Sequence, residues 1–328
     1  MKYQVSTIGD CIKDIFVIAP SEVMTKGYFG SAKKYLSFPY GDKITIQKVE
    51  YDLGGSACNG AITFSRLGFK AALSTIVGGD IYSREALEIL KKEKISNYFV
   101  FQEKGSSLGF SIILTGPDGD RTILVHRVEK DYTNINVGKI FEASEVIYVA
   151  GINKYSKILQ KKILAYTVNT KKPLFLNPSS YQIKEGRRML VKMISRSTGV
   201  CMNYVEALAF VRKKKMRRKD LLSTIHRIGT GFVIITMGSR GALFYDGTDF
   251  YKIGIYKMKV KDSAGSGDAF FATYIAGRMK GESTEDSLKL AAINSGHVAS
   301  VYGAQKGLLR WGELKEKLGE GKVKITNL

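Results

Sequence analysis

The chain has 328 residues, enough for one large domain with an appended subdomain or for two domains. Hydrophobic residues make up 44% and charged residues 25%, as in globular proteins, and no run approaches the ~18 apolar residues of a membrane span. The cysteines lie far apart and the histidines form no H-E-x-x-H motif, which argues against a disulfide framework and a histidine-built metal site. The N-terminus lacks the apolar core of a signal peptide, so we expect a cytoplasmic protein.

Charge is the unusual property of the composition, with 51 lysines and arginines against 30 acidic residues and a formal net charge of +21. Such an excess is typical of proteins that bind nucleic acid or anionic lipid. We interpret it instead as a general bias toward lysine in the proteome, or as a surface that attracts anionic nucleotides, because most of the excess is scattered along the chain. The basic run 212–219 is the exception, either a site for a phosphate-rich partner or a solvated connection between helices. We therefore expect neither nucleic acid nor a membrane as a partner.

Strand-like and helix-like segments alternate along the chain. The predicted strands are Tyr3–Ile8, Ala71–Val77, Val146–Val149, Pro173–Leu176 and Gly231–Met237. The predicted helices between them include Ala57–Leu67, Ile81–Lys94 and Ser156–Val168. This alternation predicts βαβ units and a parallel sheet that helices cover on both faces.

Two stretches, 11–52 and 97–130, interrupt this alternation with β-forming residues and turn signals. The second predicts a hairpin in which Phe110–Thr115 returns through Arg121–His126. We expect a single catalytic domain over 1–328, from which the two stretches extend as a small antiparallel sheet. A sheet at one edge of a pocket is well placed to act as a lid.

The strongest chemical signal is the heptapeptide DSAGSGD, Asp262 to Asp268, followed by a stretch that is apolar on all sides, as a buried helix is. Two glycines before a helix allow backbone amides to converge at its positively charged N-terminus, where they can bind phosphoryl oxygens. Asp268 beside such an anion hole could accept the proton of an attacking hydroxyl. The alternative is that Asp268 only complements the helix dipole.

Three further segments support a ligand site at the ends of strands. Gly54-Gly55 precedes a helix that carries Asn59, whose amide can donate to and accept from a hydroxyl group. Asn203 and Glu206 lie on one helix face and could hold water bound to Mg²⁺, or could simply form a capping box. The sequence TMGSRG at 236–241 ends a clear strand, where ligands bind in open α/β sheets. Neither a Walker A motif nor a complete G-x-G-x-x-G motif is present.

In this order, these segments resemble the ribokinase-like (PfkB) family of carbohydrate kinases over nearly the whole chain, from Ile8-Gly9-Asp10 to Gly303-Ala304-Gln305. DSAGSGD matches the family's D-[TA]-x-G-A-G-D signature except for the serines at 263 and 266, and GGSACNGAITFSRLG matches the other signature. TMGSRG is similar to the family's nucleotide loop, and LNPS at 176–179 to its Leu-Asn-Pro strand end. The resemblance implies a three-layer α/β/α sandwich with a mostly parallel central sheet and a small β-sheet lid.

The resemblance also implies a role for each matching residue. Asp268 is implied as the catalytic base, with Gly265, Ser266 and Gly267 as the anion hole. The implied ligand-binding residues are Asp14, Gly55 and Asn59 for the substrate, and Asn177, Asn203, Glu206, Thr236, Gly238 and Gly241 for ATP. The implied metal-binding residues are Asn203 and Glu206 for Mg²⁺ through water, and Asp262 for a monovalent cation such as K⁺.

The implied activity is ATP-dependent phosphorylation of a hydroxyl group of a small sugar, of ribokinase or fructokinase type, after the lid closes. A nucleoside (adenosine-like) kinase is the alternative on the same fold, because lid aromatics could stack on a base or merely pack the lid. These aromatics are Phe16, Tyr28, Phe29, Phe38, Tyr40 and Phe110. A non-catalytic nucleic-acid-binding protein on this scaffold is the third hypothesis, against which the intact DSAGSGD argues. The family includes lid-to-lid dimers, which implies a homodimer through the lid.

Overall fold

The computed structural model describes residues 2–18, 25–27, 35–115, 121–168 and 170–328. Ten of the described strands form one large sheet: β1 (Tyr3–Gly9), β6 (Ala71–Val77), β7 (Val100–Gln102), β10 (Ser144–Ala150), β11 (Leu174–Asn177), β12 (Gly199–Asn203), β13 (Val233–Thr236), β14 (Ala242–Tyr245), β15 (Phe250–Ile253) and β16 (Ile325–Asn327). Their order is β16-β15-β14-β13-β12-β11-β10-β1-β6-β7. The seven strands β7, β6, β1, β10, β11, β12 and β13 run parallel to one another. β14, β15 and β16 each pair with the preceding strand in antiparallel orientation. The predicted mostly parallel sheet is confirmed.

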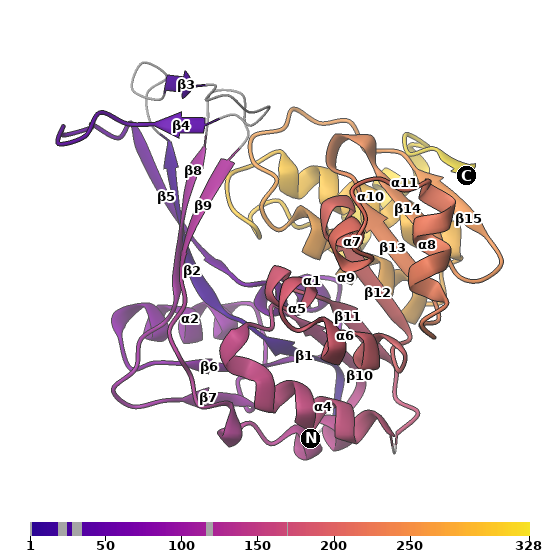
Figure 1. The fold of residues 1–328 in the computed structure, drawn as a ribbon, viewed down its shortest axis with the longest axis horizontal. Helices are drawn as coiled ribbons and strands as arrows, with labels where there is room; N and C mark the ends of the chain where they lie inside the picture. The colour runs from indigo at the N-terminus through magenta and orange to yellow at the C-terminus, as the bar shows by residue number, and fades with distance from the viewer. Residues whose placement is uncertain (1, 19–24, 28–34, 116–120, 169) are drawn as a thin grey trace.

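Helices cover both faces of this sheet (Figure 1), as the alternating sequence pattern predicts. On one face lie α1 (Ser56–Arg66), α2 (Ile81–Lys92), α9 (Ser266–Met279), α10 (Thr284–Ala299) and α11 (Trp311–Gly319). On the other lie α3 (Val137–Ala143), α4 (Lys157–Val168), α5 (Ser180–Lys184), α6 (Arg187–Ile194), α7 (Tyr204–Phe210) and α8 (Arg218–His226). Three short 3₁₀ helices are also described: η1 (Tyr132–Asn134), η2 (Lys154–Ser156) and η3 (Gly238–Arg240). Each face has its own apolar core, which gives the expected α/β/α sandwich.

A smaller sheet projects from the sandwich (Figure 1). Its strands, in the order β5-β2-β8-β9, are β5 (Lys48–Gly54), β2 (Ile12–Ile18), β8 (Phe110–Thr115) and β9 (Arg121–His126). β8 and β9 form the predicted antiparallel hairpin, whereas β2 and β8 run parallel. A separate pair, β3 (Thr25–Gly27) and β4 (Tyr35–Ser37), lies beyond it. β7 falls inside the stretch 97–130 but pairs with β6 in the large sheet, so only part of that stretch belongs to the small one.

Alternating side chains give the small sheet two different faces. Ile12 and Asp14 of β2 and Ser111 of β8 line the cavity described below, whereas Lys13 between them points to the other side, where it pairs with Glu85 of α2. The inner face therefore lies at the carboxyl ends of the parallel strands of the large sheet. Within the described ranges, no helix is both long and apolar enough to cross a membrane.

Candidate active site

A cavity of about 700 Å³ opens where the parallel strands of the large sheet end. Asn177, Asn203 and Thr236 are the last residues of β11, β12 and β13, and all three line the cavity. The start of α9 forms another wall, and the inner face of the small sheet covers the opening. The structure thus brings together every site residue that the sequence predicts except Asp262, which is buried and does not line the cavity.

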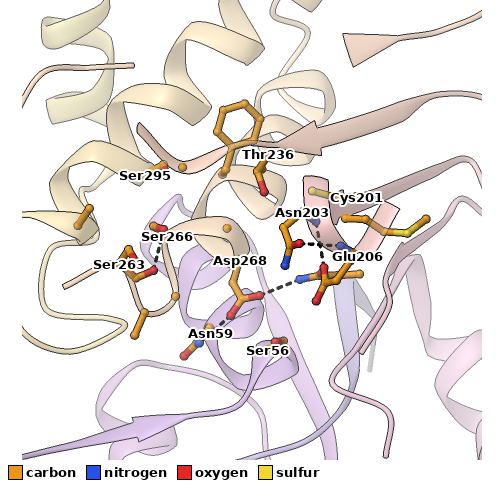
Figure 2. Close-up of a pocket in the computed structure, with 18 of the residues that line it drawn as sticks. Ser56, Asn59, Cys201, Asn203, Glu206, Thr236, Ser263, Ser266, Asp268 and Ser295 are labelled. Carbon is orange, nitrogen blue, oxygen red and sulfur yellow. Dashed lines mark hydrogen bonds between the residues drawn. The ribbon is translucent and has the colours of Figure 1, made fainter. Parts of the chain in front are cut away.

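Asp268 lies in the first turn of α9, where two amide side chains hold its carboxylate (Figure 2). Asn59 Nδ2 donates to Oδ2 at 2.8 Å, and Asn177 Nδ2 donates to Oδ1 at 2.7 Å. Gln305 Nε2 donates to Asn59 Oδ1 at 3.0 Å, which fixes the orientation of that amide. Both carboxylate oxygens retain capacity to accept a further hydrogen bond.

The environment of Asp268 would suit a proton acceptor. Burial raises its pKa above the ordinary value, although hydrogen bonds from Asn59, Ser56 and Asn177 oppose the shift. Within the described part of the chain, no cationic side chain forms an ion pair with Asp268. A carboxylate with a raised pKa is the stronger base once it is ionised.

The N-terminus of α9 lines the cavity beside Asp268. Gly265 precedes the helix with a φ of 71°, and a Cβ there would lie 2.6 Å from the Cβ of Ala304. A Cβ on Gly267 would meet no atom within 4 Å, so Gly267 borders open space. The first amides of a helix lack partners within it and carry partial positive charge. This end of α9 is therefore suited to binding phosphoryl oxygens, as DSAGSGD predicts.

Asn203 and Glu206 form the reciprocal helix cap that is the structural alternative to a magnesium role. Asn203 Oδ1 accepts from the amide of Glu206, and Glu206 Oε2 accepts from the amide of Asn203, both at 2.9 Å. Burial raises the pKa of Glu206, and the charge of Asp268 adds to the shift, whereas the hydrogen bonds from Asn203 oppose it. Both side chains also line the cavity, so capping α7 leaves Glu206 Oε1 available to a ligand.

Thr236, Gly238 and Gly241 line a second part of the cavity. Figure 2 shows Thr236 on the opposite side of Asp268 from Asn59. Gly238 and Gly241 have φ angles of 58° and 82°, and a Cβ on Gly241 would lie 1.9 Å from the carbonyl oxygen of Ile253. Further lining side chains here are mainly apolar: Ile255, Tyr256, Met258 and Val260. A largely apolar slot beside a tight turn is suited to a planar nucleotide base.

Asp14 of β2 lies under the small sheet, in the part of the cavity predicted to bind the substrate. It accepts a hydrogen bond from Ser111 of β8 and is 7% exposed. Burial raises its pKa to about 7, and nearby carboxylates add to the shift while Ser111 opposes it. A Cβ on Gly54 would lie 1.9 Å from Asp14 Oδ2, so glycine is required at the end of β5. Gly55 lines the same part, where a Cβ would lie 2.4 Å from the carbonyl oxygen of Asp10.

The sequence motifs do not identify the buried carboxylate of Asp10, which directly follows β1, as a site residue. Arg127, which follows β9, forms an ion pair with it, and Asn153 Nδ2 donates to Oδ1 at 3.1 Å. Burial raises the pKa of Asp10 to about 6, although Arg127 and Asn153 oppose the shift. Asp10 ends the run Ile8-Gly9-Asp10, but no local pattern marks Arg127 or Asn153 as its partners.

Arg121 of β9 connects the small sheet to the loop before α9. Its guanidinium donates to Asp262 Oδ1 at 3.2 Å and to the hydroxyl of Ser263. Asp262 is 1% exposed, and its Oδ2 has no hydrogen-bond partner among the described residues. This contact joins the small sheet to the loop that carries the DSAGSGD sequence.

Comparison with known proteins agrees with this geometry. The pattern of the pfkB family carbohydrate kinases matches residues 27–310. Ribokinase of Lactococcus lactis is 24% identical over 280 residues, which cover 83% of this chain and 87% of the ribokinase. Cytidine kinase of Thermococcus kodakarensis is 25% identical over 272 residues, which cover 82% of this chain and 93% of that kinase.

Among solved structures, the ribokinase of Arabidopsis thaliana complexed with ribose and ATP has a TM-score of 0.78 and 16% sequence identity. The match covers 97% of this chain and 99% of that ribokinase. The fold is therefore the ribokinase fold. Because the family match spans most of the sequence, the chain belongs to the pfkB family of carbohydrate kinases. It is a sugar or nucleoside kinase, a phosphotransferase with a hydroxyl group as acceptor.

Proposed function

We propose that this protein transfers the γ-phosphate of ATP to a hydroxyl group of a small sugar, with Asp268 as the catalytic base. The observation that carries the proposal is the position of Asp268 in the cavity, oriented by Asn59 and Asn177 beside the N-terminus of α9. A carboxylate there can take the proton of the attacking hydroxyl while the helix amides bind the oxygens of the phosphoryl group.

In the proposed reaction, the substrate oxygen attacks the γ-phosphorus, its O–H bond breaks, and the proton passes to Asp268. The bond from the γ-phosphorus to the bridging oxygen breaks, and ADP leaves with that oxygen. Gly265, Ser266 and Gly267 supply the amides that stabilise the charge on the transferred group. Asn59 and Asn177 act as positioning residues, because their amide nitrogens contact Asp268. This differs from the direct substrate and phosphate contacts that the family resemblance implies for them.

Asp14 binds a sugar hydroxyl group in this proposal. Its carboxylate accepts from Ser111 and faces the covered part of the cavity beside Gly55, where a second donor can reach it. The small sheet acts as the lid, and the contact between Arg121 and Asp262 holds it against the catalytic loop. Exclusion of water by such a lid strengthens the electrostatic interactions of the transition state.

ATP is the proposed phosphate donor, with its base near Thr236, Gly238 and Gly241. Mg²⁺ would neutralise charge on the phosphates. Asn203 and Glu206 fit such an ion through water, because both side chains line the cavity and the cap of α7 uses only Oε2 of Glu206. No cluster of three acidic, cysteine or histidine side chains in the described ranges could hold a metal alone. The residues therefore fit an ion bound mainly by phosphate and water.

A monovalent cation such as K⁺ is the proposed partner of Asp262. Its Oδ2 is buried without a hydrogen-bond partner, and a buried carboxylate oxygen in that state is unfavourable. A bound cation would satisfy this oxygen next to the anion hole. Turnover that does not change when K⁺ is replaced by tetramethylammonium would exclude the cation.

The lining of the lid favours a sugar over a nucleoside as substrate. None of the four lid aromatics in the described ranges lines the cavity: Phe16 is fully buried, Phe38 and Tyr40 are exposed, and Phe110 packs against the ring of His126. Tyr28 and Phe29 lie outside the described residues. The lid wall is aliphatic, with Ile12, Ile113, Ile123 and Val125, and no described ring offers a stacking surface for a base there. The polar groups below this wall suit the hydroxyls of a sugar.

The outer face of the small sheet supports the proposed homodimer. Side chains that point away from the cavity are largely apolar and partly exposed: Ile15, Val17, Val49, Tyr51, Ile112, Leu114 and Leu124. An exposed apolar face on a sheet is a typical contact surface. A second copy of the chain would cover it through the same residues and close a symmetric dimer.

The test of the proposed function is an assay of Asp268→Asn against the parent protein. We measure ADP release with Mg-ATP and, separately, ribose, fructose, adenosine, cytidine or ribose 5-phosphate. The parent is expected to turn over a sugar fastest. Asp268→Asn should keep ATP affinity within about threefold and lose at least 10³-fold in kcat, because the proton acceptor is gone and the orienting amides remain.

Asp249→Asn is the matched control, since Asp249 is exposed on the turn between β14 and β15, outside the cavity. It should have parental kcat and KM. Near-parental turnover by Asp268→Asn would refute the assignment of the base. Turnover with nucleosides alone would refute the sugar assignment while leaving the base in place.

A further inference from the structure

The excess positive charge is concentrated in one quarter of the chain. Residues 151–230 contain 19 lysines and arginines but only three acidic residues, Glu185, Glu206 and Asp220. The rest of the chain contains 32 basic and 27 acidic residues, which is close to balance. The interpretation that most of the excess is scattered is therefore wrong. A general bias toward lysine does not explain the distribution, because such a bias would act on the whole chain.

The fold gathers this segment onto one face of the molecule. Residues 151–230 include α4, α5, α6, α7 and α8, and the apolar sides of these helices all pack on the same side of the large sheet. α4 contacts α6, and α5 contacts both α6 and α7, while α8 packs against β13 and β14 on the same side of the sheet (Figure 1). We call the outward sides of these five helices and their connections the basic face.

Most cations of the basic face are exposed and unpaired. Fifteen of the nineteen are exposed to solvent. None of the nineteen forms an ion pair within the described ranges. Three of the less exposed cations are engaged with backbone carbonyls: Lys162, Lys172 and Arg187. Of the three acidic residues, Glu206 is turned toward the cavity, so the face has almost no acidic side chains to offset its charge.

The connection between α7 and α8 carries the densest charge. Arg212, with a φ of 58°, ends the turn after α7, and Lys213, Lys214 and Lys215 follow it in exposed positions. Repulsion among unpaired like charges is unfavourable, and a polyanion that replaces the surrounding counterions relieves it. Met216 is the only large apolar side chain in the run 212–219, and it is half-buried. This run therefore has no exposed apolar side chain with which to insert into a membrane.

We propose that the basic face binds the phosphate backbone of nucleic acid, independently of base sequence. Exposed cations spread over several helices match a chain of phosphates, whereas a single nucleotide would need only a few of them. Tyr166 is the one exposed aromatic side chain of residues 151–230, which leaves little surface for base stacking. Contacts to phosphate without contacts to bases give binding that depends on salt and not on sequence.

The test compares a triple variant, Lys213→Gln with Lys214→Gln and Lys215→Gln, with the parent protein. Binding of a fluorescein-labelled 20-nucleotide RNA of mixed sequence is measured by anisotropy from 50 to 300 mM KCl. We expect the variant to bind at least tenfold more weakly at 100 mM KCl. The magnitude of the slope of log K against log salt should fall by about 2, because each of the three lost phosphate contacts on a single strand contributes about 0.7. A second RNA of unrelated sequence should behave in the same way.

The matched control removes the same charge elsewhere, by Lys91→Gln, Lys92→Gln and Lys104→Gln. These lysines are exposed, lie outside residues 151–230 and form no ion pair within the described ranges. The control should bind RNA within twofold of the parent. All three proteins should have the same KM for ATP, because the proposed kinase site is elsewhere.

Four results would overturn the proposal. The first is no RNA binding by the parent at 100 mM KCl, and the second is an equal loss of binding in the control. The third is binding to vesicles of phosphatidylcholine with 30% phosphatidylglycerol but not to RNA, which would assign the basic face to a membrane. If RNA binding is unaffected but the triple variant alone raises the KM for ATP, the face steers nucleotides toward the cavity and the proposal is wrong. None of these results depends on whether Asp268 is the base.

Discussion

The substitution Asp14→Asn separates the effect of this buried carboxyl group on stability from its proposed role in binding the substrate. Asp14 is 7% exposed, and no cationic side chain pairs with it within the described ranges. Asparagine has nearly the same shape, carries no charge, and keeps an oxygen that can accept from Ser111. We expect the variant to be more stable than the parent at pH 8 and to bind the sugar poorly, because it lacks the charged acceptor for a hydroxyl group.

The magnitude follows from the pKa of Asp14, which burial raises from 3.8 to about 7. A difference of about three pKa units corresponds to about 4 kcal/mol. The folded protein keeps this proton to a higher pH than the unfolded chain, so ionisation of Asp14 lowers the free energy of unfolding as the pH rises from about 4 to about 7. The advantage of Asp14→Asn should therefore be small below pH 4 and reach about 4 kcal/mol at pH 8.

The assay is urea unfolding of parent and variant at pH 3, 5, 6, 7 and 8, with the difference taken at each pH so that other groups cancel. Asp131→Asn is the control, because the change in the free energy of unfolding should have the opposite sign. Asp131 caps η1, and its hydrogen bonds with Thr133 lower its pKa. That variant should be the less stable one above pH 4 and should approach the parent as the pH falls. If Asp14→Asn is less stable than the parent at pH 8, or if its advantage is the same at pH 5 and pH 8, burial does not control this carboxyl group.

Three further predictions concern the proposed anion hole and the proposed dimer. Gly265→Ala should lower the melting temperature by several degrees and kcat at least tenfold, because the left-handed φ alone costs about 1 kcal/mol and the new Cβ would approach Ala304. Gly267→Ala should unfold like the parent but lose kcat, because its methyl group would occupy open space proposed for phosphoryl oxygens; parental kcat would place the phosphate elsewhere. Tyr51→Lys should convert the proposed dimer to a monomer in sedimentation equilibrium, whereas an unchanged dimer mass would exclude the outer lid face as the contact.

The sequence predicted those parts of the site whose determinants are local. DSAGSGD fixes the start of α9, because Gly265 must adopt a left-handed conformation and the apolar stretch after Asp268 must be buried. The alternation of strands and helices predicted the sheet for a similar reason, since each period is a property of a short segment. The reciprocal cap of Asn203 and Glu206 was likewise visible from a spacing of three residues.

Contacts between distant segments were not predicted, because no periodicity or short motif encodes them. Asn59 and Asn177 were each assigned to a ligand, but in the fold both amides converge on Asp268, one from α1 and the other from the end of β11. The ion pair of Asp10 with Arg127 depends on how the hairpin folds back over β1. Identification of the basic face required both the sequence and the fold. Counting residues along the sequence shows where the charge is concentrated, but only the topology shows that the five helices lie on one side of the sheet.

The two parts of the cavity differ in charge, and this difference can orient the two substrates. Under the lid, Asp10 is balanced by Arg127, while Asp14 is ionised above pH 7 with no cation beside it. At the start of α9, backbone amides and the helix dipole provide positive potential. A triphosphate is repelled from the first part and attracted to the second, whereas a neutral sugar offers hydroxyl donors that match Asp14. We therefore infer that the acceptor is uncharged, and that ribose 5-phosphate will be a poorer acceptor than ribose in the substrate assay. The reverse order would mean that Arg127 leaves Asp10 to bind a phosphate on the acceptor.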